Sequence, residues 1–314
     1  MRFQFLLAAL VSSGAYSAEY DAKVLRLIGD DAIAAYGADL ERYANSDLSK
    51  FFPAEIPYPR FIIDPSWRAF AYIEYPAGGL AIYQGPSPPM NAVELRRRLI
   101  EEGEPTTALS QIGEIPTLSI NNCSYAILDS STAIAGDTSL VQAAITRWRT
   151  QAPIGATATK VRELSANFNN WFYILRPLRK LEGGMAAATS KYQKQLVESI
   201  DELRGGFRTG GVNQFQIEAL TQRTEDAITM AAMVRWLPGY LEAKGLGLGI
   251  IIQAIEDFDS RSSGLSVYVS FAVTDGKLRE IRAAQMPDAA PQRSPQNRPM
   301  AVTPKPANEN WHGT

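Results

Sequence analysis

The stretch from Tyr125 to Trp148 constrains the fold of this chain more than any other. It reads YAILDSSTAIAGDTSLVQAAITRW, in which two apolar runs are separated by a polar turn and followed by an amphipathic segment. From Leu140 to Trp148 the apolar residues recur at helical spacing, so they share one face. Asp137 stands where it can cap that helix. The stretch predicts a strand, a turn, a second strand and a capped helix.

A second stretch, from Gly264 to Gln285, repeats the order of strand, cap and helix with the sequence GLSVYVSFAVTDGKLREIRAAQ. Alignment of Ala135 with Ala272 matches apolar positions on both sides. It sets Asp137 against Thr274, and both residue types cap helices. We therefore expect an α+β fold with two similar lobes, each a mainly antiparallel sheet with helices packed on one face.

The N-terminus has the composition of a secretory signal peptide. Arg2 is basic, residues 3–11 form a short apolar run, and residues 12–18 are small and polar apart from one tyrosine. The apolar run is too short to cross ~30 Å of hydrocarbon as a helix. We expect residues 1–18 to be removed, the mature chain to have no transmembrane segment, and the protein to be periplasmic or secreted.

Composition also suggests where the domains end. Residues 151–159 read QAPIGATAT, which is typical of a linker. We therefore place lobe 1 at residues 19–150, a linker at 151–164 and lobe 2 at 165–285. Residues 286–314 are rich in proline and poor in aliphatic side chains, which predicts a disordered C-terminal tail.

Periodicity and turn residues predict the remaining elements. Strands are expected at 32–40, 61–64, 68–75, 80–83, 115–120, 171–175, 212–220, 250–256 and 265–273, the strand at 212–220 having one wet face. Helices are expected at 92–102, at 189–203 with Gly205 and Gly206 ending it, and from Thr224 to Tyr240, this last one buried on most sides. The segment 257–263 is expected to be the loop of the last hairpin.

The presence of only one histidine and one cysteine excludes several classes of catalytic site. The chain has one histidine, His312, in the predicted tail, and one cysteine, Cys123, which we expect to be buried and inert. Ser-His-Asp triads, Cys-His pairs and histidine-rich metal sites all need a positioned imidazole. The net charge of −2 and the pI near 5.7 give no general attraction for nucleic acid.

Three local motifs are better explained without a ligand. The glycine-rich segment 245–249 follows a predicted helix and precedes a strand, the reverse of a phosphate-binding loop. The arginines at 96–98 are surrounded by glutamates, so we expect a solvated helix face. The acids at 256–259 lack the glycine of a calcium loop and are followed by Arg261. We expect no cofactor and no metal site.

Three segments carry a resemblance to a known group of proteins. They read DDAIAAYGADLERYANSDLSKF, SYAILDSSTAIAGDTSLVQAAITRW and NFNNWFYILRP. Together they resemble uncharacterised exported proteins of soil bacteria across most of the mature chain, and the shared positions are apolar residues, Gly136, Asp137 and Trp171. The resemblance implies two related α+β lobes behind a signal peptide, and that group has no assigned activity to transfer.

Two hypotheses for the function follow. The first is a non-catalytic extracytoplasmic protein that binds or assembles with a partner protein, a small molecule or a glycan, for instance in a crevice between the lobes. The second is a hydrolase of the glycosidase type that uses two carboxylates ~5 to 10 Å apart. The candidate carboxylates, all in or beside predicted strands, are Glu74, Asp129, Glu218 and Glu256.

Overall fold

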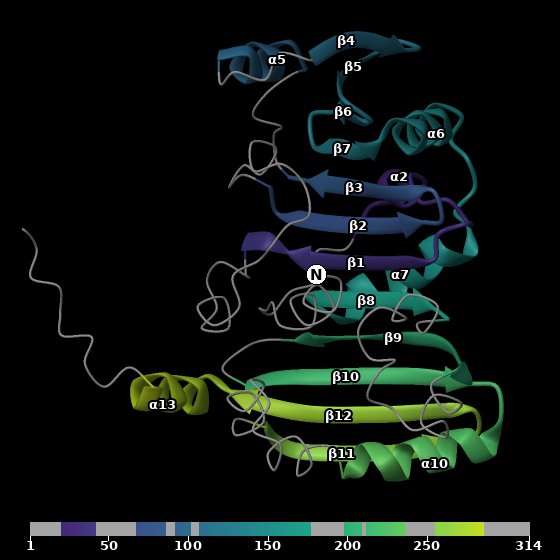
Figure 1. Cartoon of the computed structure of the whole chain (residues 1–314), viewed down its shortest axis with the longest axis vertical. Coiled ribbons are helices and arrows are strands. Elements are labelled where there is room, and N and C mark those ends of the chain that lie inside the picture. The colour runs from purple at the N-terminus through teal and green to yellow at the C-terminus, as the bar shows by residue number, and fades with distance from the viewer. Residues whose placement is uncertain are drawn as a thin grey trace, which may run out of the picture.

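The structure is a computed structural model that describes residues 20–41, 67–85, 92–101, 107–176, 198–208, 212–236 and 255–285. The strands in these ranges form one 12-stranded sheet in which neighbouring strands pair antiparallel (Figure 1). Across the sheet they lie in the order β11 (Ile255–Ser263), β12 (Ser266–Thr274), β10 (Val212–Thr221), β9 (Ile200–Arg208), β8 (Asn170–Leu175), β1 (Ala34–Asp39), β2 (Ala69–Tyr75), β3 (Gly78–Gln84), β7 (Thr132–Asp137), β6 (Cys123–Asp129), β5 (Ile115–Ile120) and β4 (Thr107–Ile112).

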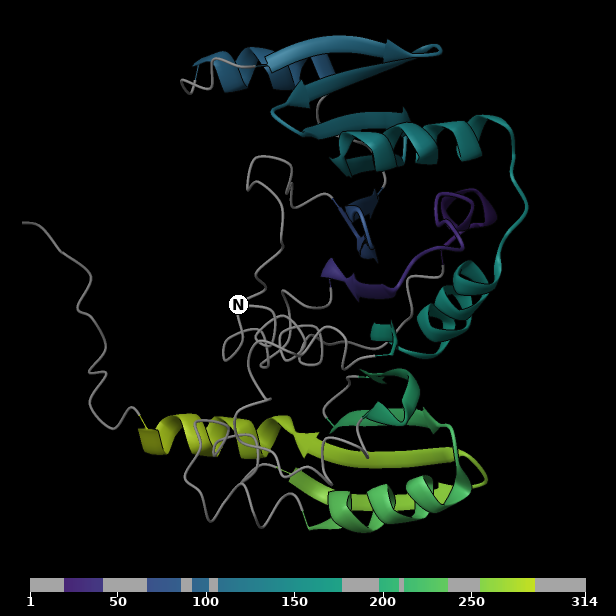
Figure 2. The same ribbon diagram turned by 45° about the vertical axis from the view of Figure 1, so that its right-hand side comes forward.

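Helices pack on both faces of this sheet, so the α+β class is confirmed. On one face, called here the α6 face, lie α2 (Ala22–Leu25), α6 (Thr138–Arg149) and α7 (Ala156–Asn167), which share a core with the sheet residues Ala35, Ile73 and Tyr173. On the opposite α10 face lie α5 (Ala92–Glu101) and α10 (Thr224–Arg235). The last helix, α13 (Asp275–Gln285), runs on from the end of β12 and away from the sheet (Figure 2).

The sheet is continuous from edge to edge. One row of directly paired residues on the α10 face crosses every strand of the sheet and is mainly apolar. In order it is Leu109, Leu118, Tyr125, Ala135, Ala81, Tyr72, Tyr36, Phe172, Gly205, Ile217, Val269 and Ser260. The polar residue that ends the row, Ser260, is buried and donates its hydroxyl to the Ala231 carbonyl of α10 at 2.9 Å. The two halves of the chain therefore share one hydrogen-bonded ladder.

That ladder joins the halves where β1 pairs with β8. Gly37 of β1 faces Trp171 of β8, and a Cβ atom built on Gly37 would lie 2.2 Å from the indole ring. The Tyr20 ring meets the same indole edge-on, with 6.0 Å between ring centroids, and the Tyr20 hydroxyl donates to the Phe70 carbonyl at 2.7 Å. Trp171 is buried, so the indole replaces the missing side chain of Gly37 and ties the N-terminal segment to both halves.

The prediction for Tyr125 to Trp148 is confirmed as β6, β7 and α6. Leu140, Val141, Ala144 and Ile145 of α6 are buried, and Trp148 packs against the same core. Asp137 is the residue before α6, but its carboxylate accepts the Gly79 amide at 2.7 Å and makes no hydrogen bond to the helix. The cap expected before the last helix does form, since Lys277 donates its amide to Thr274 Oγ1 at 3.2 Å.

The helix expected at 189–203 is wrong over its last residues, because Ile200 opens β9. Gly205 and Gly206, expected to end that helix, lie inside the strand. A Cβ atom on either would lie 2.2 Å from a carbonyl oxygen of a neighbouring strand. Strand pairing on both sides of β9 therefore overrides the helical spacing of its apolar residues.

The loop expected at 257–263 is also wrong, because these residues belong to β11 and the turn lies at Gly264, where φ is 58°. Charged residues and a register shift after Glu256 suit an edge strand, which has one unpaired side. Most of the expected linker at 151–164 is the start of α7, with Ala158, Val161 and Leu164 buried. Small residues allow α7 to lie close to the sheet, and the division into two lobes stays a prediction.

Two burial expectations also need correction. Cys123 is exposed at the start of β6. Helix α10 buries Ala227, Met230 and Ala231 but leaves Ile228 56% exposed, because it covers the sheet with one side only, and Trp236, the residue after the helix, is 79% exposed. The expected signal peptide, the strand at 61–64, the glycine-rich segment 245–249 and the tail lie outside the described residues.

We expect the substitution Gly37→Ala to lower the free energy of unfolding by about 2 kcal/mol, because the new methyl group must displace the buried indole of Trp171. Chemical denaturation followed by tryptophan fluorescence measures the change. The matched control is Gly276→Ala in α13, where an added Cβ atom meets nothing within 4 Å. Equal stabilities for the two variants would contradict this account of the β1–β8 junction.

Candidate functional site

The four candidate carboxylates lie on four different strands. Glu74 is on β2, Asp129 on β6, Glu218 on β10 and Glu256 on β11. Four strand spacings of ~4.8 Å separate β2 from β10, which is ~19 Å. Glu256 and Glu218 are two strands apart and four residues out of register, which makes ~16 Å between their backbones. Asp129 accepts the amide and the hydroxyl of Ser131 in its own turn.

Glu218 belongs to a polar row that crosses five strands on the α6 face. Its members are directly paired from strand to strand in the order Tyr173, Arg204, Glu218, Tyr268 and Arg261. Gln214, Gln216 and Ser270 lie on the same face beside it. Tyr173 is buried in the core that α7 shares, but no described helix covers the rest of the row, because α7 packs at β8 and α13 leads away from the sheet (Figure 2). We call these eight residues the polar sheet face.

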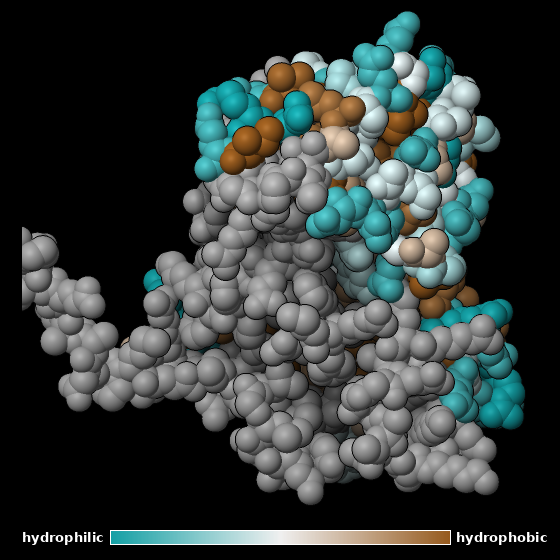
Figure 3. All heavy atoms as spheres, turned by 45° about the horizontal axis from the view of Figure 1, so that its top comes forward, coloured by the Kyte–Doolittle hydropathy of each residue, from teal (hydrophilic) through white to brown (hydrophobic). Residues whose placement is uncertain are grey.

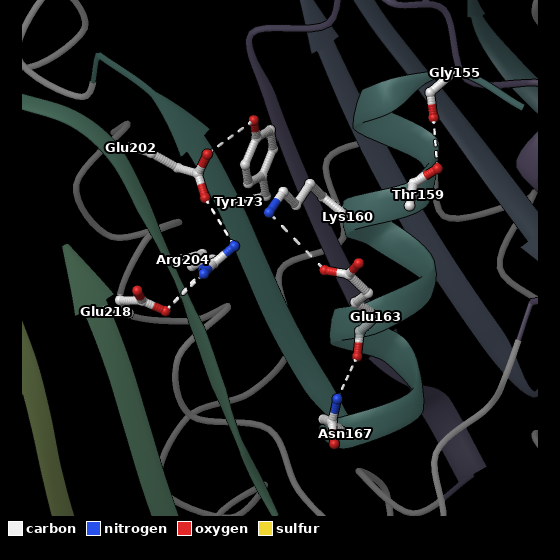
Figure 4. A network of polar contacts seen from close by, with 9 residues as sticks. All are labelled: Gly155, Thr159, Lys160, Glu163, Asn167, Tyr173, Glu202, Arg204 and Glu218. Carbon is white, nitrogen blue, oxygen red and sulfur yellow. Dashed lines mark hydrogen bonds and ion pairs between the residues drawn. The ribbon is translucent and has the colours of Figure 1, made fainter. Parts of the chain in front are cut away.

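Arg204 holds the row together through two carboxylates. Its Nη2 and Nε lie 2.8 and 2.9 Å from Glu218 Oε2, and its Nη1 lies 3.2 Å from Glu202 Oε1 (Figure 4). The Ser266 hydroxyl donates to Glu218 Oε1 at 2.8 Å, and the Tyr173 hydroxyl donates to Glu202 Oε2 at 3.4 Å. The guanidinium is thus neutralised by its neighbours and the side chains are held in place.

The electrostatics of the row keep its carboxylate charged. Partial burial alone would raise the pKa of Glu218, but hydrogen bonds from Ser266 and Arg204 and the charge of Arg204 outweigh it, so the pKa lies below its usual value. Burial, together with the charge of Glu202, raises the pKa of Tyr173 to about 12. At neutral pH the glutamate is therefore an acceptor and this tyrosine a donor.

The outer end of the row is open to solvent. Tyr268 is 36% exposed, and the Arg261 guanidinium lies over its ring, 5.6 Å from the centroid. Arg261, Gln214 and Gln216 are exposed as well. An aromatic ring stacked with a guanidinium and flanked by amides offers both flat contact area and hydrogen-bonding groups.

Other candidate residues are not brought together with this row. Although Cys123 is exposed, partial desolvation of its sulfur and the nearby Asp137 raise the pKa of the thiol, so it stays protonated near neutral pH. Arg97 of α5 pairs with Glu94 at 2.6 Å and with Glu101, as expected for a solvated face. In the described ranges, no three His, Cys, Asp or Glu side chains are grouped so as to hold a metal ion.

The sequence indicated part of this surface. Alternation over 212–220 predicted one wet face for that strand, and Gln214 and Gln216 confirm it. Arg204 directly follows the helix predicted at 189–203 and Arg261 lies in the loop predicted at 257–263, so the sequence assigns neither residue to the site. The register of β9, β10, β12 and β11 is what places them in one row.

Together, the sheet and its helices define an antiparallel α+β protein with a polar sheet face.

No family model matches the chain, and no curated protein matches it. Solved structures of TP0453 are similar in fold. Crystal form III has a TM-score of 0.50 and 9% identity, covering 83% of this chain and 97% of that one. Crystal form I has a TM-score of 0.50 and 10% identity, covering 86% and 99%. Among the described helices, none has the length and apolarity needed to cross a membrane.

We expect Glu218→Gln to lower stability at pH 7 by about 1 kcal/mol, because it breaks a partly buried ion pair. A carboxyl group whose pKa is lowered on folding stabilises the fold above its unfolded pKa, and that contribution disappears as pH falls through the folded value. The gap between wild type and variant should therefore close below pH ~4.

Urea denaturation between pH 3 and pH 7 measures this gap. The control is Glu280→Gln on α13, which removes the same charge from an exposed residue and should change stability little at any pH. A wild-type-minus-variant difference for Glu218 that stayed constant with pH would contradict the lowered pKa.

Proposed function

We propose that this protein is a non-catalytic extracytoplasmic binding protein whose partner, a protein, docks on the polar sheet face. The observation that carries this proposal is the row from Tyr173 to Arg261, which is ordered by ion pairs and which the described helices leave uncovered from Arg204 to Arg261. Helices α6 and α10 pack on other parts of the sheet through apolar side chains, whereas this row presents polar and charged groups. Ordered side chains also lose less conformational entropy when a partner binds.

The chemistry of the face suits a protein partner. Arg204 is balanced by Glu202 and Glu218, so the surface offers no strong net charge to a polyanion. Tyrosine and arginine, which are enriched in protein interfaces, stand at its exposed end as Tyr268 and Arg261. The two exposed glutamines add donors and acceptors for backbone groups of a partner.

The carboxylate-pair hydrolase is supported less well. A glycosidase acid needs a raised pKa, whereas the pKa of Glu218 is lowered. The other candidates lie ~16 Å or more from Glu218, as judged from strand spacings, beyond the ~5 to 10 Å that the reaction requires.

We also infer that the protein is exported and is built from two related halves. Export rests on the composition of residues 1–18. The order of elements supports the second point, since each half starts with a helix and three successive strands, β1 to β3 and β8 to β10. A helix on the α10 face follows in each half, and the last strand of each half, β7 or β12, pairs with the third strand; the first half has four strands after its helix, β4 to β7, and the second has two, β11 and β12.

A photo-crosslinking residue tests the binding face. Placed at exposed Gln216 and activated in the native host, it should give a discrete adduct with one partner protein. The same residue at Ala232, exposed on α10 at the opposite face, is the control and should give no such adduct. Adducts of equal yield from both positions, or none from Gln216, would refute the proposal.

Export is tested separately by N-terminal sequencing of the protein from the host's envelope fraction. We expect a mature chain that starts near residue 19. A cytoplasmic protein that retains Met1 would overturn the export inference and leave the binding face to be judged on the crosslinking alone.

A further inference from the structure

The two edges of the sheet are built differently. At one edge, β11 carries the charged residues Glu256, Asp257, Asp259 and Arg261 and a register shift after Glu256. These features discourage pairing with another strand. At the other edge, β4 reads TALSQI, has no charged residue and pairs with β5 in unbroken register. Residues 108–111 are all exposed, so β4 is an accessible edge without such protection.

The backbone groups of β4 that pair with no described strand can be assigned from its hairpin. Gly113, at φ 65°, and Glu114 connect Ile112 to Ile115 as a two-residue turn, which makes Ile112 and Ile115 a hydrogen-bonded pair. Because bonding alternates along an antiparallel pair, Ser110 and Ala108 also bond to β5. The amide and carbonyl groups of Thr107, Leu109 and Gln111 therefore point away from β5.

We propose that β4 pairs antiparallel with β4 of a second copy of this chain, about a twofold axis at Leu109, so that two sheets become one. In this register Leu109 faces Leu109 of the second copy, and Thr107 faces its Gln111. The amide and carbonyl groups of Thr107, Leu109 and Gln111 in one copy then face the same set of groups in the second copy, which gives about six hydrogen bonds between the copies. The apolar row that ends at Leu109 continues through Leu118 of the second copy.

Symmetry is the reason for choosing a second copy over a different strand. In the proposed register a charge at position 109 would meet its own copy at the twofold axis, and like charges directly opposite destabilise a sheet. With Leu109 at the axis and no charged residue elsewhere on β4, self-pairing meets no such repulsion. A strand that recognised a different partner would gain specificity from a charge complementary to that partner.

The surface next to β4 also suits association. Helix α5 packs on β4 and β5, and its Val93 and Ile100 side chains are 61% and 51% exposed, while Leu109 is 40% exposed. Figure 3 shows hydrophobic side chains in brown among hydrophilic ones at the end of the molecule that carries α5 and β4. In the proposed pairing both copies of α5 lie on the same face, so this apolar surface adds to the strand contact.

Analytical ultracentrifugation of the full chain tests the association. Wild type should sediment as a dimer, and Leu109→Lys should weaken dimerisation at least ~10-fold by placing two ammonium groups side by side at the axis. Gln111→Pro should do the same, because it removes an outward amide without a change in charge. The matched control is Leu265→Lys, at a residue 43% exposed in the β11–β12 turn, which should leave the dimer intact. Circular dichroism melts establish that the variants are folded.

A spin label on the lone cysteine distinguishes a dimer that pairs through β4 from one that pairs through β11. Cys123 is exposed, and a spin label there can measure only a distance between copies. Five strand spacings and an offset of four residues predict roughly 28 Å between the two labelled positions. Pairing through β11 would separate them by ~90 Å, beyond the range of the measurement.

A double electron-electron resonance peak near ~28 Å that is lost in Leu109→Lys and Gln111→Pro supports the proposal. A monomeric wild type, a dimer with no peak in that range, or a dimer that Leu265→Lys weakens as much as Leu109→Lys overturns it. A wild-type monomer that captures a different strand at β4 also overturns it.

Discussion

The pairing of β1 with β8 is the contact on which the rest of the structure depends. It joins strands 130 residues apart in the chain, and it does so around a glycine whose place is taken by the Trp171 indole. Tyr20 packs its ring against the same indole and donates its hydroxyl to the Phe70 carbonyl of β2. Without this junction there would be two smaller sheets, each with a further exposed edge.

Local sequence rules predict several elements whose neighbours are close in the chain, although they miss β4 and place a loop where most of β11 lies. The hairpin of β2 and β3 and the unit of β6, β7 and α6 follow from alternation, turn residues and helical spacing. These rules failed for β9, where the spacing of apolar residues is helical. Its strand structure depends on Phe172 of β8, which is distant in sequence, and on Ile217 of β10, the next strand in the chain. No pattern within 200–208 carries that information.

The candidate site was predictable to the same extent. The sequence predicts Glu218 as a carboxylate on a strand and predicts the wet face of that strand. It does not predict which side chains surround the carboxylate. Arg204 and Ser266 come from strands paired with β10, and together they hold Glu218 ionised. Composition can identify an acid in a strand, whereas its protonation depends on groups that only the register brings within hydrogen-bond distance.

The unbroken ladder across β1 and β8 also limits how the molecule can move. Proteins that trap a ligand between two domains usually close around a hinge that few hydrogen bonds cross. Here the halves share a strand pair, so a clamshell motion would have to break five residue pairs at the junction of the sheet. We therefore expect the molecule to respond to a partner as a stiff, twisted plate, recognising what fits its surface instead of enclosing it.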